Sequence, residues 1–374
     1  MKKFLKILML SLLMLVSAFA FVACGEDGGD EGKTGLLYKM YAGDSYYTVY
    51  GYVDDGSEVD TLDISEYNKD GVTIGRIKAN AFKDNNTLKT LIIPSSVETI
   101  DAGAFANMKK LETIQLPFVG ATAVADTSFN SIDEAENKSV GAERTFGYVF
   151  GSDEYTGGLA MTQYYDENNT NVTYVPSTLT KVIINNPNTE VAYNIPMYAF
   201  SGANLINEVE LKGNIEIIGE AAFKNALGLS KVNLPASVVK IEKQAFMGTT
   251  NLKTGFSIDE GSALAVLGES VFNGSAVKSV ELPASVNVIG NSCFANSKIS
   301  SVNLGSVAVI PTGAFANCDY LVEVAIPQTT TTIKAHAFLN CDALTTVVVS
   351  GSWNFEVNAN NLVNEKVNEI FVKA

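Results

Sequence analysis

The chain has 374 residues, of which 47% are hydrophobic and 18% are charged. This composition supplies enough apolar material for a core and excludes a wholly disordered chain. Its 26 basic and 41 acidic residues give a net charge of −15, which argues against nucleic acid as a partner because phosphate binding needs a basic surface.

The N-terminal segment 1–23 has the layout of a secretory signal peptide. Three lysines among the first six residues precede an apolar run of 16 residues, shorter than the roughly 20 that a membrane-spanning helix needs. The run ends in Phe-Val-Ala-Cys at positions 21–24, which resembles the lipobox of bacterial lipoproteins. The resemblance implies that Cys24 carries the lipid of an extracytoplasmic, membrane-anchored protein exposed at the cell surface, and that residues 24–35 form a flexible tether. An ordinary signal peptide with a chance cysteine is the alternative.

Residues 36–67 alternate β-forming residues without the repeat that fills the rest of the chain. We expect a strand-rich N-terminal cap here, because a repeat array needs its open end covered. Trp353, Phe355 and the closing Ile-Phe-Val at 370–372 would cap the other end.

A repeat defines the region 68–374. Its mark is a phenylalanine that follows Ala, Cys or Val, with gaps of 23, 95, 23, 23, 26, 22, 21 and 23 residues between successive copies. This spacing indicates coils that bury their apolar sides only by stacking on one another. The nine copies are Phe82, Phe105, Phe200, Phe223, Phe246, Phe272, Phe294, Phe315 and Phe338.

One coil, 229–246, shows the consensus sequence that most copies of the repeat share. It contains Leu-x-x-Val-x-Leu-Pro, in which Val232 and Leu234 are two apart and so share one face of a strand while Asn233 points outward. Strands of consecutive coils would pair in parallel, and the phenylalanines would form an internal column with ring centroids about 4.5–7 Å apart. We predict a mostly β, right-handed solenoid of about ten coils.

These repeats resemble the BspA-like type of leucine-rich repeat, which is common in surface proteins of host-associated bacteria, over roughly residues 36–374. The resemblance implies a cell-surface binding or adhesion module for a host or neighbouring-cell protein or glycan. Such a scaffold serves many roles, so the family alone does not name the ligand.

The gap of 95 residues between Phe105 and Phe200 holds a hairpin-like insertion at 134–178, after a coil at 111–129 that still fits the repeat. The insertion is rich in tyrosine, a residue that buries contact area with little loss of entropy. Its tyrosines either contact a ligand or clamp the insertion onto the solenoid. The candidate ligand-binding residues here are Tyr148, Tyr155, Tyr164 and Tyr165.

Catalytic motifs are missing from the sequence. The single histidine, His336, lies in a variable column two places before the phenylalanine, and there is no Gly-x-Ser-x-Gly, Cys-x-x-Cys or second histidine. We therefore predict that the protein is not an enzyme and holds no metal or cofactor. Cys318 and Cys341 are one coil apart and either fill a small-residue column as free thiols or form a disulfide.

The outward face of the strands offers the other candidate surface. Its mid-strand positions include a polar strip formed by Glu210, Asn233, Glu281 and Asn303, which could hydrogen-bond a peptide or a sugar. A merely solvated sheet face is the alternative. Two other functions stay open: a polysaccharide-active enzyme on a β-solenoid, which would need basic residues that the strip lacks, and a passive structural spacer.

Overall fold

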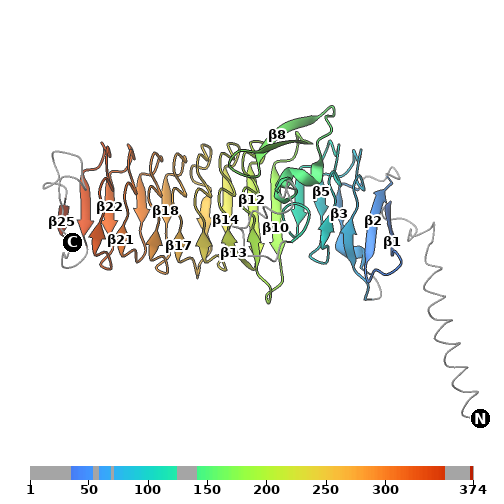
Figure 1. Cartoon of the computed structure of the whole chain (residues 1–374), viewed down its shortest axis with the longest axis horizontal. Helices are drawn as coiled ribbons and strands as arrows, with labels where there is room; N and C mark the ends of the chain where they lie inside the picture. Colours follow the sequence, from blue (N-terminus) through green and yellow to red (C-terminus); the bar gives the residue numbers. More distant parts are fainter. Residues whose placement is uncertain (1–34, 54–58, 69–70, 124–140, 350–370, 374) are drawn as a thin grey trace, which may run out of the picture.

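The computed structural model describes residues 35–53, 59–68, 71–123, 141–349 and 371–373. Within these ranges the chain winds into one elongated stack of coils with its ends at opposite tips (Figure 1). The predicted lipid-bearing Cys24, the tether and the C-terminal Trp353 and Phe355 lie outside the described residues.

One strand per coil builds the long face of the solenoid, and these strands pair in parallel, as predicted. A seven-stranded and a five-stranded sheet supply twelve strands, more than the expected ten coils. The seven-stranded sheet contains β3 (Thr61–Asp63), β5 (Thr90–Ile92), β7 (Thr113–Leu116), β10 (Lys181–Asn186), β12 (Glu208–Gly213), β14 (Lys231–Leu234) and β16 (Phe256–Ile258). The five-stranded sheet contains β18 (Ser279–Glu281), β20 (Ser301–Asn303), β22 (Glu323–Ile326), β24 (Thr346–Val349) and β25 (Phe371–Lys373).

Short strands form the return side of the coils. They are β4 (Ile74–Ile77), β6 (Thr99–Ile100), β11 (Tyr193–Ile195), β13 (Ile215–Ile218), β15 (Lys240–Ile241), β17 (Val266–Leu267), β19 (Val288–Ile289), β21 (Val309–Ile310) and β23 (Thr332–Ile333). At the N-terminal end β1 (Leu36–Lys39) pairs antiparallel with β2 (Tyr47–Tyr52), which pairs in parallel with β4 and covers the first coil. The 3-10 helix η1 (Ile64–Tyr67) follows β3, so the range assigned to the cap, 36–67, already contains the first strand of the long face.

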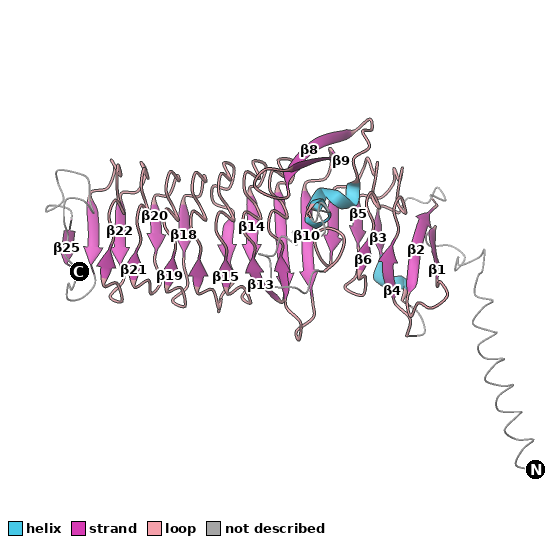
Figure 2. Ribbon diagram, viewed as in Figure 1, coloured by secondary structure: helices cyan, strands magenta, loops and turns pink. Residues whose placement is uncertain are grey.

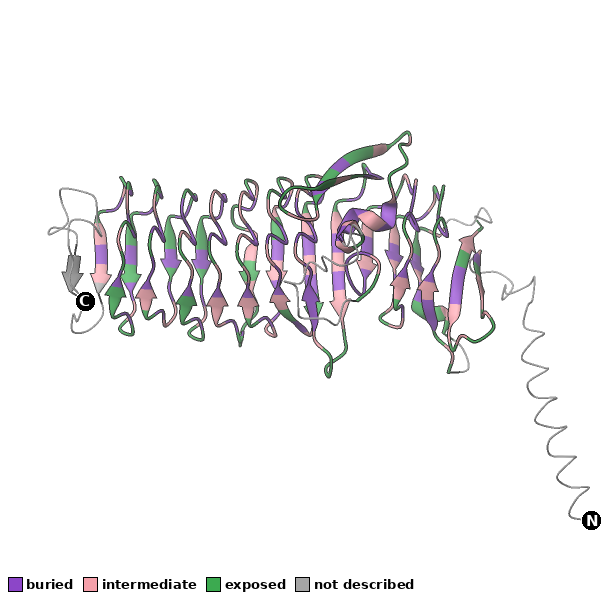
Figure 3. Ribbon diagram, in the orientation of Figure 1, coloured by how far each residue is buried: buried purple, intermediate pink, exposed green. Residues whose placement is uncertain are grey.

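The core is a set of columns that run the length of the stack. In the coil 229–246, Val232 and Leu234 are buried while Asn233 between them is half-buried, which is the period-two alternation expected of a strand with one inner face. Figure 3 shows the same buried stripe along the successive coils.

The phenylalanine column is continuous and internal. Neighbouring rings lie 5.1 Å apart for Phe200 and Phe223 and 5.0 Å apart for Phe223 and Phe246, with planes within 3° of parallel. The predicted column is therefore confirmed. Between regular coils, the phenylalanine N–H donates to the carbonyl of the residue before the next phenylalanine, as from Phe223 to Ala245 at 2.7 Å, whereas the Phe105 N–H donates to Val149 of the insertion. These bonds require the coils to approach closely.

The backbone at two corner positions adopts a left-handed conformation in every repeat that carries the phenylalanine. The residue two places before the ring has φ between 53° and 66°, and His336 is one of these residues with φ 60°. The residue two places after the ring also has positive φ, as in Asn107 and Asn317. The variable column that contains His336 is thus defined by a backbone turn.

The insertion interrupts one coil but adds no strand to the long face, because β7 pairs directly with β10. The 3-10 helices η2 (Ala142–Arg144) and η3 (Phe146–Phe150) come first, followed by an antiparallel hairpin of β8 (Gly158–Tyr164) and β9 (Thr170–Pro176) that rises beside the coils (Figure 2). Phe150 lies 6.1 Å from Phe105 and Phe146 lies 5.2 Å from Phe200, so these two rings carry the column across the gap. Phe129, the ring of the expected coil, lies outside the described residues.

Candidate functional site

The strand face brings the predicted polar strip into register. Glu210 lies beside Asn233, and Glu281 beside Asn303, as cross-strand neighbours. The exposed Ser257 of β16 pairs with Asn233 and also belongs to the strip. The sequence reasoning missed Ser257 because its coil reads Gly-Phe-Ser-Ile and departs from the consensus sequence.

The carboxylate of Glu210 already forms ion pairs within the protein. Its oxygens lie 3.1 Å from Lys181 Nζ and 3.0 Å from Lys212 Nζ, and Glu208 is bridged in turn by Lys181 at 3.1 Å and by Lys231 at 2.9 Å. The pKa of Glu208 lies below its ordinary value, first because Lys231 donates a hydrogen bond to it, an effect that burial opposes and Lys181 reinforces. A ligand at this point must replace existing ion pairs.

The amide of Asn233 is also occupied. Its nitrogen donates to Asp259 at 3.1 Å, and its oxygen accepts from Ser257 at 2.7 Å. Asn303 accepts from the backbone N–H of Gly305 at 3.0 Å. Glu281 is exposed and makes no ion pair within the described residues, so it is the member of the strip most accessible to a partner.

The four predicted tyrosines do not form one patch. Tyr148 is half-buried in η3, where burial raises the pKa of its phenol, and Tyr155 is half-buried in the loop before β8. Tyr165 packs against Gly141, where an added methyl group would lie 2.4 Å from its ring. Only Tyr164 is exposed, with 39% of its surface accessible, on the outer face of the hairpin.

A buried glutamine, which the sequence reasoning did not single out, holds the hairpin on the solenoid. Gln163 Oε1 accepts from the Gly147 N–H at 2.6 Å, and its Nε2 donates to the Ala199 carbonyl at 3.2 Å. Gly147 must be a glycine, because an added Cβ would lie 2.0 Å from the Thr173 hydroxyl. The sequence did not indicate this role, because the strand buries the polar Gln163 and exposes the aromatic Tyr164, and the solenoid partner of Gln163 lies 36 residues away.

The comparison with protein families identifies the repeat. The model of the BspA type leucine rich repeat region matches residues 70–148, 170–261 and 254–361, which together exceed half of the chain. The chain belongs to the BspA-type leucine-rich repeat family. The expected resemblance is therefore confirmed, and no curated protein matches the sequence.

Three of the solved structures that are similar to this BspA-type protein are described as leucine-rich proteins. A leucine-rich repeat protein from Bacteroides ovatus is 17% identical, with 86% of this chain and 85% of that chain covered and a TM-score of 0.36. The T. pallidum leucine rich repeat protein is 24% identical, with 52% and 90% covered and a TM-score of 0.40. A leucine rich cell surface protein from Faecalibacterium prausnitzii is 16% identical, with 91% and 97% covered and a TM-score of 0.27.

Within the described ranges, His, Cys, Asp and Glu side chains nowhere gather in threes as metal ligands would. His336 is exposed, and the acidic Asp166 closes the hairpin turn by accepting from the backbone of Asn168 and Asn169. In the part of the chain that the structure describes, no helix is long and apolar enough to cross a membrane.

The cysteines of the repeat are free and buried. Cys318 and Cys341 donate to the carbonyls of Phe294 and Phe315, each at 3.0 Å, and Cys293 occupies the small position before Phe294. Burial raises the pKa of the Cys293 thiol. The structure thus favours the space-filling alternative over the disulfide.

Proposed function

We propose that this BspA-type protein is a surface-tethered binding module that holds a protein of a host or a neighbouring cell on the outer face of its β8–β9 hairpin. The observation that supports the proposal is that apolar and aromatic side chains are exposed on the outer face of a hairpin whose inner face packs on the core. Tyr164 and Val172 are 39% and 42% exposed, and Ala160 and Thr162 beside them are exposed as well.

The hairpin is suited to binding because its inner face is fixed. Met161 and Val175 are buried in the core, and Gln163 joins the hairpin to the backbone of η3 at Gly147 and to the backbone of the solenoid at Ala199. A surface that is already ordered loses little entropy on binding, so more of the contact energy appears as affinity. Tyrosine is a favoured contact residue at protein interfaces.

The polar strand face is the second surface of the same module. Glu281 and Asn303 are exposed neighbours there, whereas Glu210 and Asn233 would have to exchange internal contacts for ligand contacts. We therefore expect a partner that reaches the strip to depend on Glu281 more than on Glu210.

The proposed tether places the module outside the cytoplasm. If Cys24 is acylated, cells fed radiolabelled palmitate will incorporate label into the chain, and Cys24→Ser will abolish the label. Absence of label in the parent protein would contradict the anchor and leave an ordinary signal peptide.

The test of binding uses the purified protein against immobilised extracellular-matrix proteins and mucin, measured by biolayer interferometry. We expect saturable binding that Val172→Ser together with Tyr164→Ser weakens at least tenfold, because each removes apolar contact area. The control is Val288→Ser, since Val288 is 48% exposed and lies in β19, outside the insertion. Equal effects of the two changes would contradict the hairpin site, and no binding to any panel member would leave a passive spacer.

A further inference from the structure

The N-terminal cap exposes more apolar surface than its short length would suggest. Leu37 of β1 is 36% exposed and Tyr50 of β2 is 41% exposed, and Met40 and Val53, which follow these strands, are exposed as well. Four of the thirteen exposed large apolar side chains among the described residues thus fall in the cap. Leu37 lies against Gly51, the residue after Tyr50, where an added methyl carbon would be 3.1 Å from the leucine.

Two lysines and two tyrosines join this apolar surface through direct contacts. Lys39 Nζ lies 4.7 Å from the centre of the Tyr41 ring and 5.2 Å from that of Tyr50. Lys78 Nζ lies 4.3 Å from the centre of the Tyr41 ring and donates to its hydroxyl at 2.7 Å. These contacts place one set of neighbours on the outer side of the β1–β2–β4 sheet. We call this set the cap face: Leu37, Lys39, Tyr41, Tyr50 and Lys78.

Carboxylates do not neutralise the two lysines of the cap face. Within the described residues, neither Lys39 nor Lys78 forms an ion pair, although Asp44 lies in the turn between β1 and β2. The nearby Asp101 is occupied by Arg76, whose Nη2 lies 2.9 Å from it. An ammonium group has three donors, and Lys78 spends one on a tyrosine, so both lysines keep N–H groups for an external acceptor.

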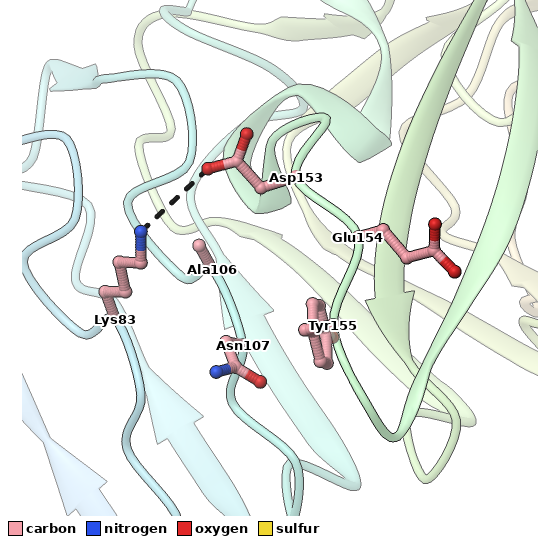
Figure 4. A pocket seen from close by; sticks show the side chains of 6 residues that line it. All are labelled: Lys83, Ala106, Asn107, Asp153, Glu154 and Tyr155. Atoms are coloured by element: carbon pink, nitrogen blue, oxygen red, sulfur yellow. Dashed lines mark ion pairs between the residues drawn. The ribbon is translucent and has the colours of Figure 1, made fainter.

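Lysines elsewhere on the solenoid show the contrast. On the long face, Lys231 lies 2.9 Å from Glu208. Between the coils and the insertion, Lys83 lies 3.9 Å from Asp153 across a cavity of about 440 Å³ (Figure 4). Such a pair attracts an external anion weakly, because its two charges largely cancel at a distance. The cap face therefore carries uncompensated positive charge on a chain whose net charge is −15.

The position of the cap face along the chain indicates what covers it. Gly35, whose carbonyl accepts from the Val53 N–H, is joined to Cys24 by the ten residues 25–34. A flexible chain of this length spans about 17 Å on average and at most about 35 Å. If Cys24 is acylated, the cap is thus held close to the bilayer. The tether has four acidic residues and one lysine, so attraction to anionic lipid must come from the cap face.

Each kind of side chain on the cap face matches one part of a phospholipid surface. Lysine ammonium groups are attracted to anionic headgroups, and tyrosine rings are amphipathic and favour the headgroup level. An exposed leucine gains free energy at the boundary with the acyl chains. The tether makes docking an intramolecular step, so even a weak affinity keeps the cap on the lipid.

We infer that the cap face docks on an anionic phospholipid surface, that of the membrane to which the tether fastens the protein. The inference rests on the proposed tether and adds which part of the solenoid lies against the membrane. The β8–β9 hairpin lies further along the stack from β1 and β2 (Figure 1), so it stays accessible to a partner while the cap is docked.

The test measures co-sedimentation of the purified chain 25–374 with vesicles, which scores the cap face without the acyl anchor. The described fold begins at residue 35, so this chain keeps all of its contacts. We expect binding to vesicles of phosphatidylglycerol and phosphatidylcholine, and much weaker binding to phosphatidylcholine alone. Lys39→Gln together with Lys78→Gln should weaken binding about fivefold for each lysine. The matched control is Lys253→Gln with Lys278→Gln, which changes the net charge equally at two exposed lysines outside the cap.

A second pair of variants probes the apolar contact. Leu37→Ser should weaken binding to the anionic vesicles about threefold or more, whereas Leu227→Ser, at a leucine that is 50% exposed elsewhere, should not. No binding to anionic vesicles, equal binding to neutral ones, or equal effects of the two lysine pairs would overturn the inference. Palmitate labelling scores the tether separately: label without vesicle binding overturns the docking alone, and vesicle binding without label supports the cap face and contradicts the anchor.

Discussion

Replacing one ring in the middle of the phenylalanine column tests the stacking that holds the solenoid together. Phe246 is fully buried and contacts three rings, Phe223 at 5.0 Å, Phe272 at 5.5 Å and Phe256 at 5.4 Å. Phe246→Ala leaves a cavity and removes all three contacts, so we expect a loss of about 4–5 kcal/mol, near the top of the range for such changes.

The same substitution at the last phenylalanine of the described column provides the control. Among the described residues, Phe338 is almost fully buried and contacts one ring, Phe315 at 5.3 Å. Because each aromatic pair contributes about 0.5–1.5 kcal/mol beyond burial, Phe338→Ala should cost about 1–3 kcal/mol less than Phe246→Ala. Because the coils form a one-dimensional array, Phe246→Ala also weakens the interfaces with both neighbouring coils, whereas Phe338→Ala weakens the interface with the coil of Phe315.

Urea titrations followed by far-UV circular dichroism measure both losses, and hydrogen exchange shows whether the array divides at the substituted coil. A loss below about 1 kcal/mol for Phe246→Ala would mean that the column is not internal. Equal losses at the two positions would refute the claim that stacking between coils, rather than burial alone, sets the stability.

Three further outcomes follow from the geometry. His336→Val should destabilise the protein by about 1–2 kcal/mol, because a β-branched residue resists φ 60°, while His336→Gly should not; thermal melts compare them. The hydrogen bond from Lys231 lowers the pKa of Glu208 in the folded protein. The ionised carboxylate therefore stabilises the fold above the unfolded pKa of about 4.3, and this stabilisation is lost as the pH falls through the lower folded pKa. In Glu208→Gln, the melting temperature should fall less steeply as the pH is lowered through this range. Gln163→Leu leaves the Gly147 N–H unpaired and removes one of the two hydrogen bonds to the Ala199 carbonyl, so hydrogen exchange within 141–178 should accelerate while the other coils stay protected. Unchanged exchange there would contradict the anchoring role of Gln163.

The repeat made the fold predictable from the sequence. Stacked coils place equal positions above one another, so a residue pattern read in one coil, such as Val232, Leu234 and Phe246, holds for its neighbours. The repeat pattern did not predict the coils that depart from it. The strand β16 with Ser257 was missed, and the rings that fill the corner of the interrupted coil are Phe146 and Phe150.

The corner turns were hidden for a different reason. The column that contains His336 also holds Asn, Gly, Tyr, Ala, Gln and Ser, and these residues share a backbone conformation rather than a side-chain property. Asparagine and glycine tolerate positive φ and hint at it, but Tyr198 and Ala221 do not.

The contacts of the candidate surfaces needed the three-dimensional register. The sequence placed Glu210 on the outer face correctly, but its ion pair with Lys181 joins residues one coil apart, and only the pairing of β10 with β12 brings them together. The cavity joins Asn107 to Tyr155 across the insertion, a distance along the chain that no repeat period could indicate.

Regular stacking also explains why we place the proposed binding surface at the insertion. In a regular coil each corner amide finds its partner in the next coil, so the finished stack offers a ligand few unmet groups. An interruption of the repeat instead creates a projecting surface, which a rigid scaffold needs in order to recognise another molecule.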